Sequence, residues 1–127
     1  MKTTISPAAT KSKTDTRLVE ALQLVLADSY ALTALSHDAH WNVEGPGFFS
    51  LHKAFEDHYE DLFEAVDEIA ERIRALGHYA QGGLLRLGRL AGLEEFTAPM
   101  TQKDYVAALV VAHEKTDRKS TRLNSSH

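Results

Sequence analysis

The chain has 127 residues, a formal net charge of −4 and the apolar and charged fractions of an ordinary globular protein, which is enough for one modest core. It contains no cysteine, so disulfides, thiolate metal ligands and cysteine nucleophiles are excluded, and a metal ion must be held by histidine and carboxylate side chains. We expect no apolar run long enough to span a membrane and no signal peptide, and therefore a cytoplasmic protein. The negative charge indicates that the body of the protein attracts DNA weakly.

The sequence pattern of the N-terminal third predicts a disordered tail followed by a long helix. Residues 1–14 are rich in Thr, Ser, Ala and Lys, which is typical of disorder. From about Asp15 to Val43, seven residues at spacings of three and four share one helix face. They are Leu18, Leu22, Val25, Ser29, Leu32, Ser36 and His40. The segment from Glu44 to Gly47 holds two glycines and a proline and predicts a loop.

A second helix is expected from about Phe48 to Leu76, and Gly77 provides a stop. Its apolar stripe consists of Phe55, Leu62, Val66, Ile69, Ile73 and Leu76. A short helix is expected between residues 84 and 93, and a third long helix from Thr101 to about Lys115. No strand-like alternation is present, so the predicted class is all-α, with the two long helices forming part of a helix bundle.

Two pairs of candidate metal ligands lie on the second predicted helix, one of a histidine and a carboxylate and one of two carboxylates. His52 and Glu56 are four residues apart and share a helix face, and Asp67 and Glu71 repeat that spacing. The rise from His52 to Asp67 is roughly 22 Å, so the two pairs cannot hold one ion within one chain.

A symmetric dimer removes that difficulty. If two copies of the second helix pack antiparallel about a two-fold axis at the middle of the helix, residue i meets residue j and j meets i. One register then places His52 opposite Glu71 of the partner subunit and Glu56 opposite Asp67 of the partner subunit. Each dimer would hold two equivalent sites.

His40 fits the same arrangement. The hairpin between His40 and His52 is centred at Pro46, so both histidines lie at about the same level along the axes of the two antiparallel helices. Two imidazoles and up to three carboxylates suit Fe²⁺, Mn²⁺ or Zn²⁺, and spacing does not choose among them. The sequence has no Glu-x-x-His motif, the element of ferritin-like di-iron sites that lie inside a single bundle. The interface site is therefore the one expected.

At these residues the chain resembles the Dps family of mini-ferritins. The matching stretch runs from His40 to His52 (HWNVEGPGFFSLH), followed by Glu56, Asp67 and Glu71, and the likeness extends from about Leu18 to Glu114. The resemblance implies a ferritin-like four-helix bundle assembled into a hollow dodecamer, which oxidises Fe²⁺, typically with hydrogen peroxide, stores ferric iron and protects DNA. It implies metal ligands His40, His52 and Glu56 from one subunit and Asp67 and Glu71 from its partner; the expected catalytic residues are His40, His52, Asp67 and Glu71. The family usually has Asp where this chain has Glu56.

The C-terminal segment departs from the family pattern. Residues 117–127 have no amphipathic period and match, in frame, the translation of a common short-read sequencing adapter. We therefore expect a partial Dps domain over residues 15–116, an adapter-derived segment over 117–127, and the end of the third and all of the fourth bundle helix to be missing. An open apolar groove should result. The alternative is a natural Ser/Arg-rich tail.

Other features have less specific interpretations. His37, His58, His78 and His113 are expected to be structural or surface histidines. Trp41 is expected to anchor packing near the subunit interface, and the resemblance places the corresponding Trp close to the iron.

Two other functions are compatible with the sequence. In a chromatin-compacting protein, Lys2, Lys11 and Lys13 of the tail would contact DNA phosphates non-specifically. In a purely structural helical dimer, the site would hold Zn²⁺ or no metal.

Overall fold

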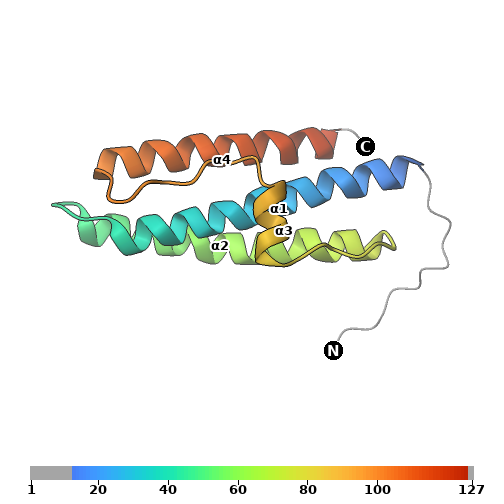
Figure 1. The fold of residues 1–127 in the computed structure, drawn as a ribbon, viewed down its shortest axis with the longest axis horizontal. Coiled ribbons are helices and arrows are strands. Elements are labelled where there is room, and N and C mark those ends of the chain that lie inside the picture. The colour runs from blue at the N-terminus through green and yellow to red at the C-terminus, as the bar shows by residue number, and fades with distance from the viewer. Residues whose placement is uncertain (1–12, 126–127) are drawn as a thin grey trace, which may run out of the picture.

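The computed structural model describes residues 13–125, which form four helices (Figure 1). They are α1 (Lys13–Asn42), α2 (Phe48–Ala75), α3 (Leu84–Leu90) and α4 (Gln102–Ser125). These described residues contain no strand, which confirms the predicted all-α class. The expected disordered tail lies outside the described residues, except for Lys13 and Thr14, which begin α1.

The first helix is the centre of the fold. It packs against α2 in an antiparallel hairpin, against α4 on another side, and against the short α3 (Figure 1). Six of the seven residues predicted to share its inner face are buried, and Leu18 is half-buried. One core cluster lies near the hairpin loop and includes Leu32, Phe55 and Tyr105, and a second lies near the other end of the bundle and includes Leu26 and Ile73.

The expectation that no apolar run is long enough to span a membrane is wrong for α1, by length and composition alone. Its segment Thr16–Asn42 has the length and apolar composition of a candidate membrane span, with a mean hydropathy of 1.4. However, 61% of that apolar stretch is buried inside the bundle. A high hydropathy is expected for α1, because other helices cover this core helix on several sides.

The hairpin loop depends on Gly45. Its φ of +111° is sterically allowed for glycine but unfavourable for residues with a Cβ atom. A Cβ at this position would also lie 3.0 Å from Nε2 of Gln102. We expect Gly45→Ala to lower the free energy of unfolding by about 1–3 kcal/mol, measured by urea denaturation. Gly47→Ala is the matched control because Gly47 has an ordinary φ of −89° and meets the same flexible Gln102 side chain. Equal losses in both variants would contradict this assignment of strain to Gly45.

The third long helix begins as predicted but does not end near Lys115. The Thr101 hydroxyl accepts a hydrogen bond from the Asp104 backbone N–H at 3.1 Å, which caps the start of α4. The helix then continues to Ser125 because tertiary contacts replace the missing amphipathic pattern. Lys119 pairs with the buried carboxylate of Asp28, and Leu123 packs against the second core cluster.

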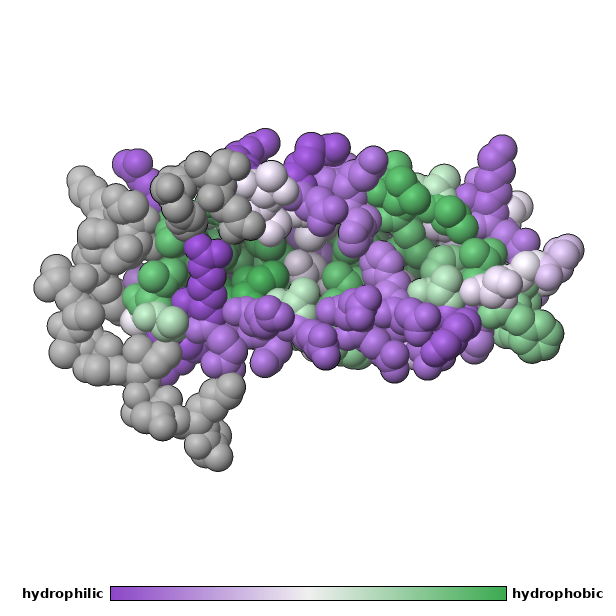
Figure 2. All heavy atoms as spheres, turned by 180° about the vertical axis from the view of Figure 1, so that it is seen from behind, coloured by the Kyte–Doolittle hydropathy of each residue, from purple (hydrophilic) through white to green (hydrophobic). Residues whose placement is uncertain are grey.

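The expected groove is present between α2 and α4. On the face opposite that of Figure 1, hydrophobic residues lie between more polar rims (Figure 2). The floor of the groove is formed by α1, and its apolar lining includes Val25, Leu32, Leu62 and Ile69. The three long helices therefore leave one side of the core uncovered by the described residues.

Candidate metal centre

His40 and His52 meet at the loop end of the α1–α2 hairpin. Their rings stack with centroids 3.7 Å apart and planes 15° from parallel. The Nδ1 atom of His40 lies 2.6 Å from the backbone carbonyl oxygen of His52, and Nδ1 of His52 lies 2.8 Å from that of His40. Each histidine therefore fixes the ring of the other through its own backbone.

This reciprocal pairing determines the protonation of both rings. A carbonyl oxygen can only accept a hydrogen bond, so Nδ1 must carry the proton in each histidine. In a neutral imidazole the Nε2 atom then holds the lone pair, which is the form that binds a metal ion. Backbone carbonyls commonly orient metal-binding histidines in this way. The hairpin thus presents two oriented Nε2 donors.

The carboxylates fall into two groups. Glu56 is one turn after His52, with 33% of its side chain exposed and its Oε2 atom 4.0 Å from the Lys53 ammonium. Asp67 is exposed and Glu71 is half-buried, and both lie several turns further along α2. Among the described residues of a single chain, no group of three or more His, Asp or Glu side chains is arranged to hold a metal ion. One chain therefore brings together the two histidines, with Glu56 on the next turn, and leaves Asp67 and Glu71 apart from them.

Aromatic side chains surround the histidine pair. The Tyr59 ring meets His40 edge-on at 5.3 Å and lies 4.1 Å from His37, which stacks on Trp41 at 5.1 Å. Burial lowers the pKa of His37, and nearby His40 lowers it further. Burial raises the pKa of the Tyr59 hydroxyl, with smaller contributions from Glu56 and Glu60. Tyr59 was not among the predicted site residues, because an aromatic residue at helical spacing usually indicates ordinary packing.

The same side of the hairpin exposes large apolar side chains. Trp41 is 68% exposed, Phe49 is 85% exposed and Phe63 is 48% exposed. Trp41 is therefore not an anchor of this chain's own core. Trp41 and Phe63 both contact the His37 ring, with centroids 5.1 and 5.8 Å away, and exposed aromatic side chains grouped in this way are typical of an interaction site.

Comparison with known proteins identifies the class and then the family. A family model described as a ferritin-like domain matches residues 19–123, so the helical hairpin is that of a ferritin-like protein. A low temperature-induced protein of Nostoc is 42% identical over 102 residues, 80% of this chain and 57% of that protein. The DNA protection during starvation protein 2 of Bacillus anthracis is 33% identical over 98 residues, 77% of this chain and 67% of that protein.

A crystal structure of the Dps protein from Vibrio cholerae, described as a member of the ferritin-like diiron-carboxylate superfamily, superimposes with a TM-score of 0.84 at 26% identity. The alignment covers 93% of this chain and 78% of that one. The chain belongs to the Dps family, as its resemblance predicted. It spans little more than half the length of the first curated relatives that it matches.

Proposed function

We propose that two copies of this chain form iron-oxidising sites of the Dps type, each shared across a two-fold interface. The observation that carries the proposal is the reciprocal pairing of His40 and His52, which leaves both Nε2 atoms free to bind Fe²⁺. Glu56, on the next turn, supplies the first anionic oxygen. A histidine pair fixed so firmly beside a carboxylate serves metal binding better than packing.

The partner subunit supplies the remaining carboxylates. Antiparallel packing of two α2 helices places Glu71 of the partner subunit beside His52 and Asp67 of the partner subunit beside Glu56. The exposed apolar side chains Trp41 and Phe63 support this interface, because dimerisation would bury them. Each site then combines two imidazoles with carboxylates, a set that suits Fe²⁺ and accepts Zn²⁺ or Mn²⁺ as substitutes.

The chemistry follows from the ligand set. Two Fe²⁺ ions each lose one electron, and one hydrogen peroxide molecule accepts both electrons and two protons as its O–O bond breaks, giving two water molecules. The carboxylates favour this direction because anionic oxygens stabilise Fe³⁺ more than Fe²⁺. Removing Fe²⁺ and peroxide together suppresses radical formation, which protects DNA without requiring contact with it.

The larger assembly is part of the same proposal. The full protein would form a hollow dodecamer in the bacterial cytoplasm or nucleoid and store the ferric product inside. Relatives are named for DNA protection during starvation, and a Listeria innocua Dps structure was obtained after soaking with zinc. Direct DNA binding would be non-specific and would involve Lys2 and Lys11, which lie outside the described residues, and Lys13, which begins α1.

We separately propose that residues 117–127 derive from a sequencing adapter rather than from the natural gene. The contacts of Lys119 and Leu123 show that this segment can continue α4, and they do not bear on its origin. Resequencing the source gene across the codons for Glu114 to His127 tests the proposal. We expect the reading frame to continue into a different, amphipathic segment; a gene that encodes residues 117–127 would refute it.

Iron binding itself can be tested without oxidation. We expect anaerobic Fe²⁺ titration, followed by calorimetry, to show a site that weakens on the order of 10–100-fold in Glu56→Ala, because one anionic ligand is lost. Glu56→Asp, the residue usual in the family, should retain most of the affinity. Unchanged Fe²⁺ affinity in Glu56→Ala would remove Glu56 from the ligand set.

A further inference from the structure

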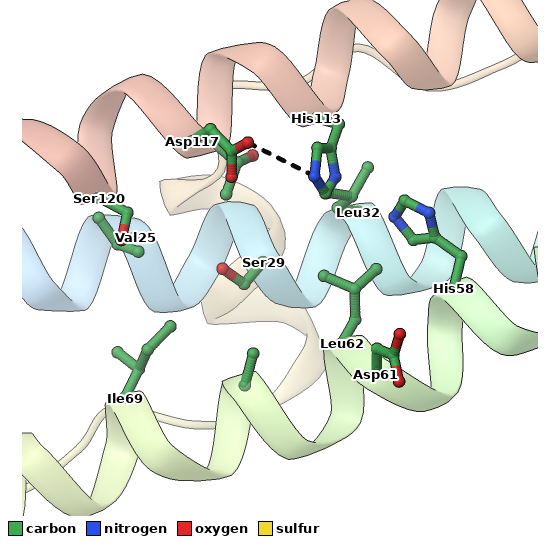
Figure 3. Close-up of a pocket in the computed structure, with 12 residues that line it drawn as sticks. Val25, Ser29, Leu32, His58, Asp61, Leu62, Ile69, His113, Asp117 and Ser120 are labelled. Atoms are coloured by element: carbon green, nitrogen blue, oxygen red, sulfur yellow. Dashed lines mark ion pairs between the residues drawn. The ribbon is translucent and has the colours of Figure 1, made fainter.

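A second pair of histidines lies in the groove between α2 and α4 (Figure 3). The groove has a volume of about 310 Å³. His58 reaches into it from α2 and His113 from α4, with ring centroids 4.9 Å apart and planes 79° from parallel. The two residues are far apart in the sequence, and only the packing of both helices on α1 brings their rings together.

The facing nitrogens of these rings have no partner. Nε2 of His58 and Nδ1 of His113 are both buried and make no hydrogen bond. Figure 3 shows the two rings turned toward one another across the groove. Buried polar atoms are usually paired, because desolvation without a partner is unfavourable. Two such atoms facing one gap indicate that a ligand belongs between them.

The surroundings prepare both rings to bind a cation. Nε2 of His113 lies 3.5 Å from the Asp117 carboxylate, which draws the proton to Nε2 and leaves the lone pair on Nδ1. The carboxylates of Asp61 and Asp117 line the same groove as His58. A neutral imidazole beside carboxylates is the form that coordinates a metal ion.

The separation of the rings fits a shared ion. Imidazole nitrogens bind Zn²⁺ at about 2.0–2.1 Å, so two rings on one ion have centroids roughly 4.5–5.2 Å apart when the angle at the ion is between about 90° and 110°. The observed 4.9 Å lies inside that range.

We propose that His58 and His113 form a second metal site within each chain, which binds a divalent transition-metal ion such as Zn²⁺ or Cu²⁺. Imidazole nitrogens suit both ions, and in this chain, where the groove is open, water completes the coordination. The site is independent of the iron site, because the helical periodicity places His58 on the opposite side of α2 from Glu56. Both ligands precede residue 117, so only the orienting Asp117 depends on the adapter-like segment.

The test isolates this site by using His52→Ala as the background, which disables the proposed iron site. Copper binding is followed by electron paramagnetic resonance, whose hyperfine pattern reports the coordinating nitrogens. We expect His52→Ala to bind one Cu²⁺ per chain through two imidazole nitrogens. Adding His58→Gln or His113→Gln should remove that signal, and adding His78→Ala should leave it unchanged.

A second measurement, the Tm with and without Zn²⁺, distinguishes a loss of metal binding from misfolding of the variants. Zn²⁺ should raise the Tm of His52→Ala, because a metal that binds only the folded state stabilises it. The metal-free Tm of the two Gln variants shows whether they are folded. In folded Gln variants the Zn²⁺-dependent rise in Tm should disappear. Asp117→Asn should weaken Zn²⁺ binding roughly tenfold. The proposal is overturned if the Gln variants retain the two-nitrogen copper signal or the Zn²⁺-dependent Tm shift.

Discussion

Replacing His52 by Ala is expected to slow peroxide-dependent oxidation of Fe²⁺ by a factor on the order of 100 or more. The substitution removes Nε2 of His52, a proposed iron ligand. It also removes the Nδ1–H group that donates to the His40 carbonyl and the ring that stacks on His40. The remaining imidazole therefore loses one of the contacts that orient it. The rate is measured from the absorbance of the ferric product in stopped flow.

Two further variants sharpen that result. Glu71→Gln should show a comparable loss, because it neutralises the carboxylate that, in the proposed dimer, faces the histidines from the partner subunit. His78→Ala is the control, since His78 lies in the connection after α2, away from the histidine pair. Wild-type rates in both His52→Ala and Glu71→Gln would refute the site assignment.

The second large effect is on stability and concerns Asp28. This carboxylate is fully buried, accepts a hydrogen bond from the Gly92 backbone N–H at 2.7 Å, and pairs with Lys119 of α4. It thus ties α1 to both the loop before α4 and α4 itself. We expect Asp28→Ala to lower the free energy of unfolding by about 3 kcal/mol, because it leaves the Gly92 donor and the Lys119 charge without their partner.

Urea denaturation at one fixed protein concentration measures this loss. Lys119→Ala should cost less than Asp28→Ala, because the Lys119 side chain is 39% exposed and water can replace its partner. The matched surface variant is Lys53→Ala, which breaks the 3.0 Å pair with Asp57 and should change stability little. If Asp28→Ala is no more destabilising than Lys53→Ala, the buried carboxylate does not hold the helices together.

The hairpin could be predicted from the sequence because its local signals agree. Apolar residues at helical spacing define one face of each helix, and the loop contains Gly45, whose positive φ requires glycine. The observed bounds of α1 and α2 lie within two residues of the predicted ones, which is ordinary for helix ends. His40 and His52 were brought together correctly, because a short loop between antiparallel helices fixes their relative height.

The end of α4 could not be predicted in the same way. Residues 117–125 lack an amphipathic pattern, and their helical conformation accompanies contacts with α1 and the second core cluster. The meeting of His58 and His113 was also missed, because each reads as an isolated histidine on its own helix. The bonds from His40 and His52 to backbone carbonyls leave no signal in the sequence, since every residue carries a carbonyl.

The second helix carries different chemistry on its two sides. Glu56 and Phe63 lie on the side that, in the proposed dimer, meets the partner subunit, whereas His58 and Ala65 face the groove. A change on one side should therefore leave metal binding on the other intact. This separation allows the two proposed sites to be tested one at a time.

Complementation between two inactive variants tests the shared iron site most directly. In a dimer of His52→Ala with Glu71→Gln, one site carries both substitutions and the other is fully wild type. If the two variants are coexpressed in equal amounts and pair at random, we expect about a quarter of all sites to be intact and about a quarter of the wild-type Fe²⁺ oxidation rate. A mixture no more active than the separate variants would show that the ligands are not shared between subunits and would contradict the account.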